Sequence, residues 1–220
     1  MNQTELPLSF RYRAPKDPSK KAPALILLHG YGSNEDDLFS FAGELPDDYA
    51  IFSLRAPLAM QPFGYAWYSI YFDGGMDKFT DDEQALTARA SIVECIDAIV
   101  RDYPVDPNKV CLIGFSQGCI LSLAVALSYP KKIRAVVGLS GYIHPPIIDI
   151  KDKAAYTGLD IYSSHGMADQ VIPVSWARNT PPFLDQLEIR NSYSEFPVGH
   201  GVAPQNFFEF RSWLLGVLDQ

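Results

Sequence analysis

The chain has 220 residues, a length typical of one α/β domain, and 47% of them are hydrophobic, which is enough for one large core. Its formal net charge of −8 at pH 7 would repel a polyanion, so nucleic acid is excluded as an expected ligand. We therefore expect a single domain over residues 1–220.

Strand-like and helix-like patterns alternate along the chain. Strands are expected at 8–13 (an edge strand), 24–28, 50–54, 109–113, 133–139, 159–164 and 190–196. Helices are expected at 34–45, 81–103, 120–127, 174–187 with a break at Pro181-Pro182, and 204–218. This alternation predicts an α/β fold with a mainly parallel sheet of about seven strands and helices on both faces.

The helix expected at 81–103 has the clearest ends. Thr80 and Glu83 form the pattern of a capping box at its start, and Pro104 follows its end. The acidic run Asp81-Asp82-Glu83 is typical of a solvated helix start that complements the helix dipole. No histidine or further carboxylate has the spacing of a metal ligand there, so we expect no metal and no cofactor.

Cysteine usage and the chain's N-terminus bear on the cellular compartment. Cys95, Cys111 and Cys119 fall within apolar patterns, without the spacing of a disulfide framework or a zinc site. The first residues lack the basic start and apolar run of a signal peptide. The longest apolar stretch, 120–127, is too short to span a bilayer. We expect a cytoplasmic protein with no stable membrane insertion.

The most informative motif is Gly114-Phe115-Ser116-Gln117-Gly118, which lies between an apolar strand pattern and an apolar helix pattern. A serine at such a strand–turn–helix junction is forced into a strained backbone conformation, and glycines two positions away let the two arms pass closely. This pattern predicts a nucleophile elbow with Ser116 as the nucleophile. The alternative is an ordinary glycine-rich turn between a strand and a helix.

A serine nucleophile needs a base, and the chain has four histidines. His200 lies between two glycines after the last expected strand, where it can reach across the sheet edge, so we assign it as the base. His29 and His165 each end a strand in a His-Gly pair, where a hydrogen bond to the adjacent turn is the simpler expectation. His144 precedes two prolines and is expected in a loop.

A histidine base needs an acceptor that orients it. Asp169 follows the strand expected at 159–164, and a carboxylate there would fix the imidazole tautomer and stabilise the imidazolium. The alternative role for Asp169 is that of a helix N-cap or turn residue. The chain order Ser116, Asp169, His200 is that of α/β-hydrolases.

The tetrahedral intermediate of acyl transfer needs backbone donors. We expect one from the amide of Gln117, directly after the nucleophile, and the other from the amide of Tyr31 in the glycine-rich loop after Leu28. The alternative for that loop is a tight turn whose glycines have no further role.

Together these motifs resemble the phospholipase/carboxylesterase family of α/β-hydrolases, which includes acyl-protein thioesterases. The matching segments are Leu28-His29-Gly30-Tyr31-Gly32, Gly114-Phe115-Ser116-Gln117-Gly118, Leu139-Ser140-Gly141-Tyr142, His165-Gly166 with Asp169 and Val171-Ile172-Pro173, and Gly199-His200-Gly201. The resemblance implies an α/β-hydrolase fold without a large cap domain, acting on carboxylic ester or thioester bonds, with lysophospholipase activity left open.

Two departures bear on the substrate. The segment Asn34-Glu35-Asp36-Asp37 looks more like the smaller bacterial carboxylesterase-like members than the eukaryotic thioesterases, and Cys119 stands where a further glycine is common. Both weaken the case for a protein-deacylating substrate and leave the expected chemistry unchanged.

An aromatic segment at 61–75 is the candidate wall of an acyl pocket. The resemblance implies pocket positions for Trp67 and Tyr68, because the family has an aromatic pair there, and Tyr142 is a candidate for the opposite wall. The alternatives are a loop that its aromatic residues anchor to the core, or an oligomer contact, which leaves a homodimer open.

The leading hypothesis is a serine hydrolase that cleaves carboxylic esters or thioesters of small acyl substrates through an acyl-enzyme. A peptidase or C–C hydrolase on the same scaffold is a second hypothesis, since a fold does not determine its substrate. A catalytically silent binding protein is a third.

Overall fold

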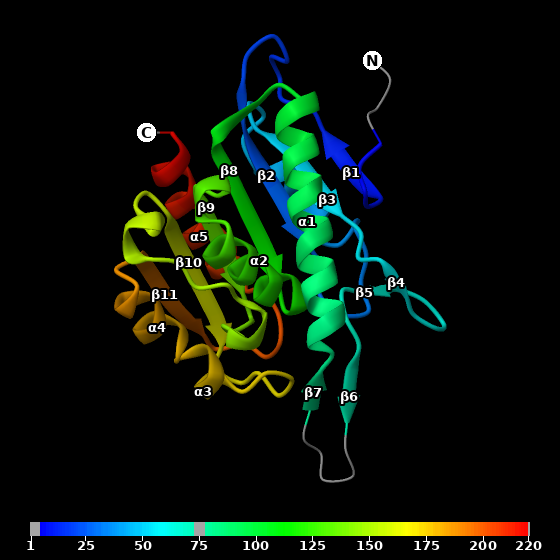
Figure 1. Ribbon diagram of the computed structural model, residues 1–220, viewed down its shortest axis with the longest axis vertical. Helices are drawn as coiled ribbons and strands as arrows, with labels where there is room; N and C mark the ends of the chain where they lie inside the picture. The colour runs from blue at the N-terminus through cyan, green and yellow to red at the C-terminus, as the bar shows by residue number, and fades with distance from the viewer. Residues whose placement is uncertain (1–4, 73–77, 220) are drawn as a thin grey trace.

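Seven strands form one sheet at the centre of the computed structural model, which describes residues 5–72 and 78–219 (Figure 1). In spatial order they are β1 (Phe10–Arg13), β3 (Ala50–Leu54), β2 (Ala22–Leu28), β8 (Val105–Phe115), β9 (Ala135–Leu139), β10 (Asp160–Gly166) and β11 (Arg190–Phe196). Every neighbouring pair is parallel except β1 and β3. The expectation of a mainly parallel sheet of about seven strands with an N-terminal edge strand is confirmed.

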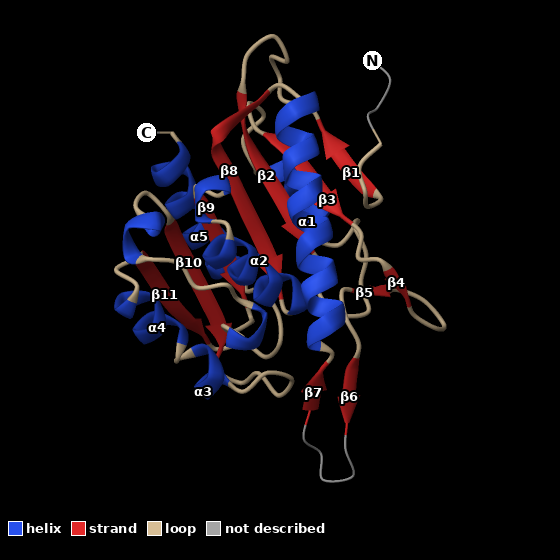
Figure 2. Ribbon diagram, viewed as in Figure 1, coloured by secondary structure: helices blue, strands red, loops and turns tan. Residues whose placement is uncertain are grey.

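Helices cover both faces of the sheet, as expected. Helices α1 (Asp82–Asp102), α2 (Gln117–Ser128) and α4 (Thr180–Gln186) pack on one face, and α5 (Pro204–Leu218) packs on the other with the 3₁₀ helix η1 (Leu38–Glu44). Figure 2 shows α1 and α2 in front of the sheet and α5 behind it. Side chains alternate between these two cores along each strand: Leu112 faces α1 and α2, and Ile113 faces α5.

The start of α1 differs from the expected capping box. Thr80 ends the short strand β7 (Lys78–Thr80), and the N-cap is Asp81, whose carboxylate accepts a hydrogen bond from the backbone amide of Gln84 at 3.0 Å. The predicted capping box of Thr80 and Glu83 is therefore wrong, and the N-cap lies one residue later, because the chain stays extended through Thr80. Tyr103 ends the helix before Pro104, as expected.

The segment expected as one broken helix at 174–187 forms two. Helix α3 (Val174–Ala177) ends before Arg178, and α4 begins at Thr180 with both prolines in its first turn. A proline costs no hydrogen bond there, because first-turn amides have no partner within the helix. The break therefore lies at Arg178 and Asn179, before the proline pair rather than at it. The helix expected at 34–45 is shorter too and is the 3₁₀ helix η1.

The chain between β3 and α1 leaves the sheet as two small antiparallel ribbons. One pairs β4 (Leu58–Ala59) with β5 (Tyr65–Ala66), and the other pairs β6 (Ile70–Phe72) with β7. Further 3₁₀ turns are η2 (Pro130–Lys132), η3 (Pro145–Ile147) and η4 (Lys153–Tyr156). Across residues 5–72 and 78–219 none of these pieces forms a large cap domain, in agreement with the expected fold.

All three cysteines are buried free thiols, as their apolar surroundings predicted, and burial raises the pKa of each, that of Cys95 to about 11. Within the described chain no helix has both the length and the apolar character to cross a membrane.

Candidate active site

Ser116 lies at the tip of a sharp turn between β8 and α2, where its backbone has φ 55° and ψ −117°. This conformation is strained for a residue with a side chain. The flanking glycines explain how the turn fits: a Cβ on Gly114 would overlap the carbonyl of Gly118, and a Cβ on Gly118 would overlap the carbonyl of Leu28. The geometry is that of the expected elbow, with the serine raised at the carboxyl end of the sheet.

The structure brings together the three residues that the chain order predicted. Nε2 of His200 lies 2.9 Å from Oγ of Ser116, and Nδ1 of His200 lies 2.7 Å from Oδ2 of Asp169. Because an ionised carboxylate only accepts, we assign the ring proton to Nδ1, and Nε2 then accepts from the serine hydroxyl. Asp169 follows β10 and His200 follows β11, so neighbouring strands present the two side chains at one edge.

Asp169 is held in its ionised form. Burial alone would raise its pKa, but hydrogen bonds from His200 and from the backbone amides of Ile172 and Val171 outweigh burial, so the pKa lies below its ordinary value. The amides of Val171 and Ile172 donate to Oδ1 at 2.8 and 2.9 Å. Asp169 therefore stabilises the turn that begins at it, which agrees with the alternative role of a turn residue.

Gln117 and Tyr31, the two expected oxyanion donors, have backbone amides that bond no acceptor within the described residues. Gln117 is the first residue of α2, so its N–H has no carbonyl to bond within the helix. Across the described residues the amide of Tyr31 donates to no acceptor. Both residues line the same cavity as Ser116. A Cβ on Gly30, next to Tyr31, would stand only 3.0 Å from the ring of Phe115, so this loop needs its glycine to approach the elbow.

The side chain of Gln117 has a structural role that the sequence did not indicate. Its Oε1 accepts from the amide of Trp67 at 3.1 Å, and its Nε2 donates to the carbonyl of Tyr68 at 2.8 Å. The residue after the serine thereby anchors a segment that precedes it by about fifty positions. No local pattern signals such a contact, because its two partners are backbone groups.

His29 stabilises the loop that carries Tyr31, as its His-Gly pair led us to expect. Its Nδ1–H donates to the carbonyl of Gly30 at 2.7 Å, and its Nε2 accepts from the amide of Ala56 at 3.1 Å. Burial lowers the pKa of His29, so the ring is neutral at pH 7 and both of its nitrogen atoms are paired.

The other two histidines also contact nearby chain. His165 donates to the carbonyl of Ile172 at 2.9 Å, which agrees with the expected bond to an adjacent turn. His144 lies before η3, and its Nε2 is 2.7 Å from Oδ1 of Asp82 at the start of α1.

A cavity of about 180 Å³ opens beside Ser116. It is lined by Tyr31, Tyr68, Ile70, Thr80, Ser116, Gln117, Ile120, Tyr142, Val171, Ile172 and Trp176. Tyr68 and Tyr142 are thus wall residues, as expected. Burial raises the pKa of both phenols, so both are neutral at physiological pH.

Trp67 does not line this cavity, and its expected pocket position is a correction. Only 1% of its surface is exposed, and its Nε1 donates to the carbonyl of His29 at 2.9 Å. Both rings belong to the core between the sheet and α1, but only Tyr68 also lines the cavity. The aromatic segment therefore combines a core anchor with a pocket wall; residues 73–75 of that segment lie outside the described part.

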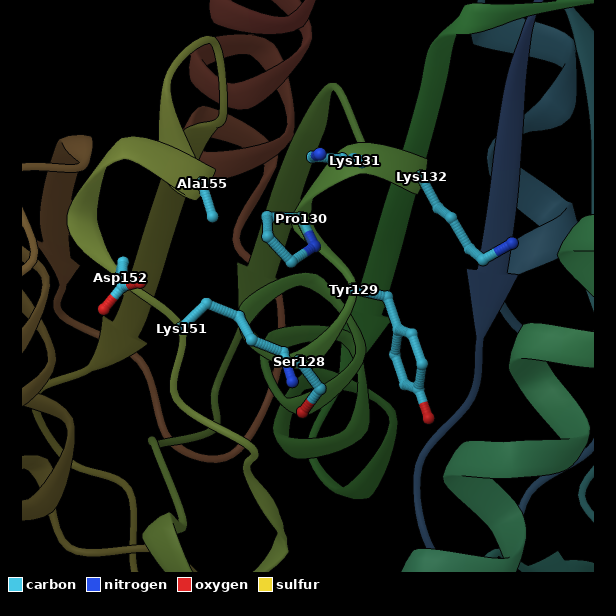
Figure 3. Close-up of a pocket in the computed structure, with 8 residues that line it drawn as sticks. All are labelled: Ser128, Tyr129, Pro130, Lys131, Lys132, Lys151, Asp152 and Ala155. Carbon is cyan, nitrogen blue, oxygen red and sulfur yellow. The ribbon is translucent and has the colours of Figure 1, made fainter.

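A larger recess of about 400 Å³ lies at the other end of α2, lined by Ser128, Tyr129, Pro130, Lys131, Lys132, Lys151, Asp152 and Ala155 (Figure 3). Lys132 reaches away to an ion pair with Asp97, and the Ser128 hydroxyl is already bonded to Arg89 and to the amide of Asp149. This recess is larger than the cavity beside Ser116, and two of its polar side chains, Lys132 and Ser128, already bond other residues.

No group of three or more His, Cys, Asp and Glu side chains in the described part of the chain is arranged to hold a metal ion.

Known proteins resemble this chain over most of its length. The acyl-protein thioesterase 1 of Yarrowia lipolytica is 29% identical over 224 residues, covering 92% of this chain and 96% of that protein. A protein of Oryza sativa subsp. japonica described as a probable carboxylesterase is 30% identical over 138 residues. That match covers 61% of this chain and spans about half, 51%, of the rice protein.

Solved structures share the fold. The Bacillus cereus carboxylesterase superposes with a TM-score of 0.82 at 18% identity, covering 96% of this chain and 94% of that one. Esterase PE8 superposes with a TM-score of 0.81 at 26% identity, covering 96% and 99%. These likenesses identify the architecture as an α/β-hydrolase fold.

The sequence profile described as Phospholipase/Carboxylesterase matches residues 13–215, which is nearly the whole chain. The chain belongs to the phospholipase/carboxylesterase family of α/β-hydrolases.

Proposed function

We propose that the protein is a serine hydrolase that cleaves carboxylic ester or thioester bonds of small acyl substrates. The observation that carries the proposal is the chain of contacts from Ser116 through His200 to Asp169, at 2.9 and 2.7 Å, with the serine in a strained turn. A core-packing serine needs neither the strain nor the base. The names of the family and of the relatives support the same reaction class.

In the proposed reaction, Oγ of Ser116 attacks the acyl carbon while Nε2 of His200 takes the hydroxyl proton. The amides of Tyr31 and Gln117 donate to the oxyanion, and His200 returns the proton to the departing alkoxide or thiolate. Water then attacks the acyl-enzyme with His200 again as base, which releases the carboxylic acid and restores the serine. Asp169 stays ionised and stabilises the imidazolium.

The cavity favours a short acyl group. Its volume of about 180 Å³ falls below the range of roughly 300–1,000 Å³ that is typical of pockets for drug-sized ligands. Its walls are mainly apolar and aromatic, with Tyr68 and Tyr142 on them. We therefore expect hydrolysis to be fastest for acyl chains of a few carbons, and slow for a long-chain lysophospholipid.

The first test is the pair of wild type and Ser116→Ala, assayed on p-nitrophenyl acetate and butyrate. Loss of the nucleophile is expected to lower kcat on the order of 10⁶-fold. A fluorophosphonate probe is expected to label wild type covalently and to leave Ser116→Ala unlabelled. Full activity in Ser116→Ala would contradict the assignment, and an unlabelled, inactive wild type would favour the silent binding protein.

A second assay sets the substrate class. Wild type is given p-nitrophenyl esters from two to sixteen carbons, the matching thioesters, a lysophosphatidylcholine and short peptide amides. We expect kcat/KM to fall as the acyl chain outgrows the cavity and peptides to be poor substrates. A preference for peptides over esters would replace the esterase proposal with a peptidase.

A further inference from the structure

A second histidine lies beside the carboxylate of the proposed triad. His165 is the penultimate residue of β10, and its side chain has no exposed surface. Its Nε2 lies 2.9 Å from the carbonyl oxygen of Ile172 and 3.2 Å from Oδ2 of Asp169, the same oxygen that contacts His200. Both neighbours of Nε2 are acceptors, so this nitrogen carries a proton.

The other ring nitrogen of His165 is left unpaired. Nδ1 is buried and has no hydrogen-bond partner among the described residues. A proton on Nδ1 would be a buried donor without an acceptor, so the neutral Nε2–H tautomer is favoured. A leucine could fill this space without leaving a buried polar atom unpaired. Packing alone therefore does not explain an imidazole here, whereas the contact of Nε2 with the turn does.

His165 and Asp169 together bond both backbone groups of Ile172, at the end of the turn from Asp169 to Ile172. The amide of Ile172 donates to Oδ1 of Asp169 at 2.9 Å, and the carbonyl of Ile172 accepts from His165. The N–H of His165, in turn, lies beside Oδ2. The turn is thereby fixed at both ends, and Ile172 also lines the cavity beside Ser116.

We propose that His165 is a positioning residue, which fixes the rotamer of Asp169 and the Ile172 wall of the cavity and partly neutralises Oδ2 toward His200. The inference rests on the proposed function, since it assigns a task only if Asp169 orients a catalytic imidazole. His165 touches neither Ser116 nor the space for the substrate.

The charged surroundings of His165 are acidic. Asp169 faces it from the turn after β10, and Glu195 stands opposite it in the register of β11. Glu195 is itself paired with Arg178 at 2.7 Å and accepts from the hydroxyl of Tyr193 at 3.0 Å. His200 is separated from His165 by the shared carboxylate oxygen. The Nε2–H of His165 therefore faces the same oxygen, Oδ2 of Asp169, that contacts His200.

The test compares His165→Leu, which removes the donor, with His165→Gln, whose amide nitrogen reaches the position of Nε2. Ser163→Ala is the matched control, because Ser163 lies on the same face of β10 and its buried hydroxyl has no partner in the described residues. Each variant is assayed on p-nitrophenyl butyrate from pH 5 to pH 9, together with its melting temperature.

We expect kcat of His165→Leu to fall roughly 10- to 100-fold, because the carboxylate is less well aligned. KM changes less. The acid limb of kcat/KM moves to higher pH, because a less neutralised Oδ2 stabilises the imidazolium of His200. His165→Gln retains most of the rate, and Ser163→Ala resembles wild type in both rate and pH profile.

A folded His165→Leu variant with wild-type kcat and an unmoved acid limb would overturn the inference. Equal losses in the Leu and Gln variants with an unmoved limb would do so as well, since that is a packing defect. If His165→Leu does not fold, His165→Gln is compared with His165→Asn, whose shorter amide cannot reach the Nε2 position and is expected to lose the rate. An inactive, unlabelled wild type would instead refute the proposed function.

Discussion

At Ser116 the backbone is strained, and the space for that strain comes from two glycines. A Cβ on Gly118 would overlap the carbonyls of both Leu28 and His29, at the end of β2 from which the Tyr31 loop begins. The elbow and that loop therefore depend on one close backbone approach, and the expected oxyanion donors stay near each other only while it is preserved.

Gly118→Ala is expected to lower the free energy of unfolding by about 3 kcal/mol, the upper end of the usual cost of overpacking, because neither carbonyl can move without disturbing β2. Esterase activity should fall with it, since the elbow is pushed away from Tyr31. Urea unfolding followed by circular dichroism measures the first effect and a p-nitrophenyl butyrate assay the second.

Gly216→Ala is the control for this experiment. Gly216 lies within α5, and a Cβ there meets nothing within 4 Å. Alanine favours a helix interior over glycine by roughly 0.5–1 kcal/mol, so this variant should be slightly more stable than wild type. If both glycine variants unfold at the same urea concentration, the close approach at Gly118 does not have the proposed importance.

At the scale of an element, α1 shows how one residue sets a boundary. Its N-cap, Asp81, accepts from the amide of Gln84, and the next residue, Asp82, contacts His144 beside the Tyr142 wall. The start of the longest helix is thereby joined to the rim of the cavity.

Asp81→Ala is expected to cost about 1 kcal/mol of stability, the usual effect of losing an N-cap side chain. Asp81→Asn should be nearly neutral, because an amide oxygen can accept the same bond. Thermal unfolding of the two variants next to wild type measures the difference. An Ala variant as stable as wild type would contradict Asp81 as the cap.

Several elements were predictable to within a residue, and the reason is local. Strand 50–54 and helix 204–218 match the observed β3 and α5, since burial on both faces of a strand or on one helical stripe leaves a direct pattern in the sequence. Strand 190–196 also matches β11, although most residues of this edge strand are only partly buried. The bounds of the helix expected at 34–45 could not be predicted in this way. Its seven residues in 3₁₀ geometry bury only Leu38 and Ala42 and therefore leave no full amphipathic stripe in the sequence.

At the scale of the whole molecule, the buried carboxylates of Glu35 and Asp169 indicate how the stability of the fold varies with pH. A hydrogen bond from Arg55 lowers the pKa of Glu35, and the pKa of Asp169 lies below its ordinary value because of the donors around it. Since each pKa is lower in the folded chain, both groups bind protons more readily when unfolded. The stability that the two carboxylates contribute is fully present above their pKa in the unfolded chain, which is about 4. It is lost as the pH falls through their lower pKa in the folded chain.

We therefore expect the melting temperature to be nearly constant from pH 7 to about pH 5 and to fall steeply below about pH 4. Glu35→Gln should be less stable at pH 7 and show a shallower fall in acid, because one linked proton has been removed. Differential scanning calorimetry between pH 3 and pH 7 measures both. Parallel curves for the two proteins would mean that Glu35 contributes nothing to the acid transition.

Local patterns were enough to predict the α/β class, most strand and helix positions, and the order of Ser116, Asp169 and His200 at strand ends. These features depend on local burial patterns and on glycines at tight turns, and both are visible in residues close together in the sequence. The adjacency of the three side chains also follows, because parallel strands present their carboxyl ends at one edge.

The packing of distant elements determines which member of the Trp67-Tyr68 pair lines the cavity, what the side chain of Gln117 bonds, and how small the cavity is. Tertiary packing also places His165 beside the carboxylate of Asp169 that contacts His200. In these cases the partner is a backbone group or a side chain brought close by packing. Such contacts leave no period or spacing in the chain, because they depend on how whole elements pack together.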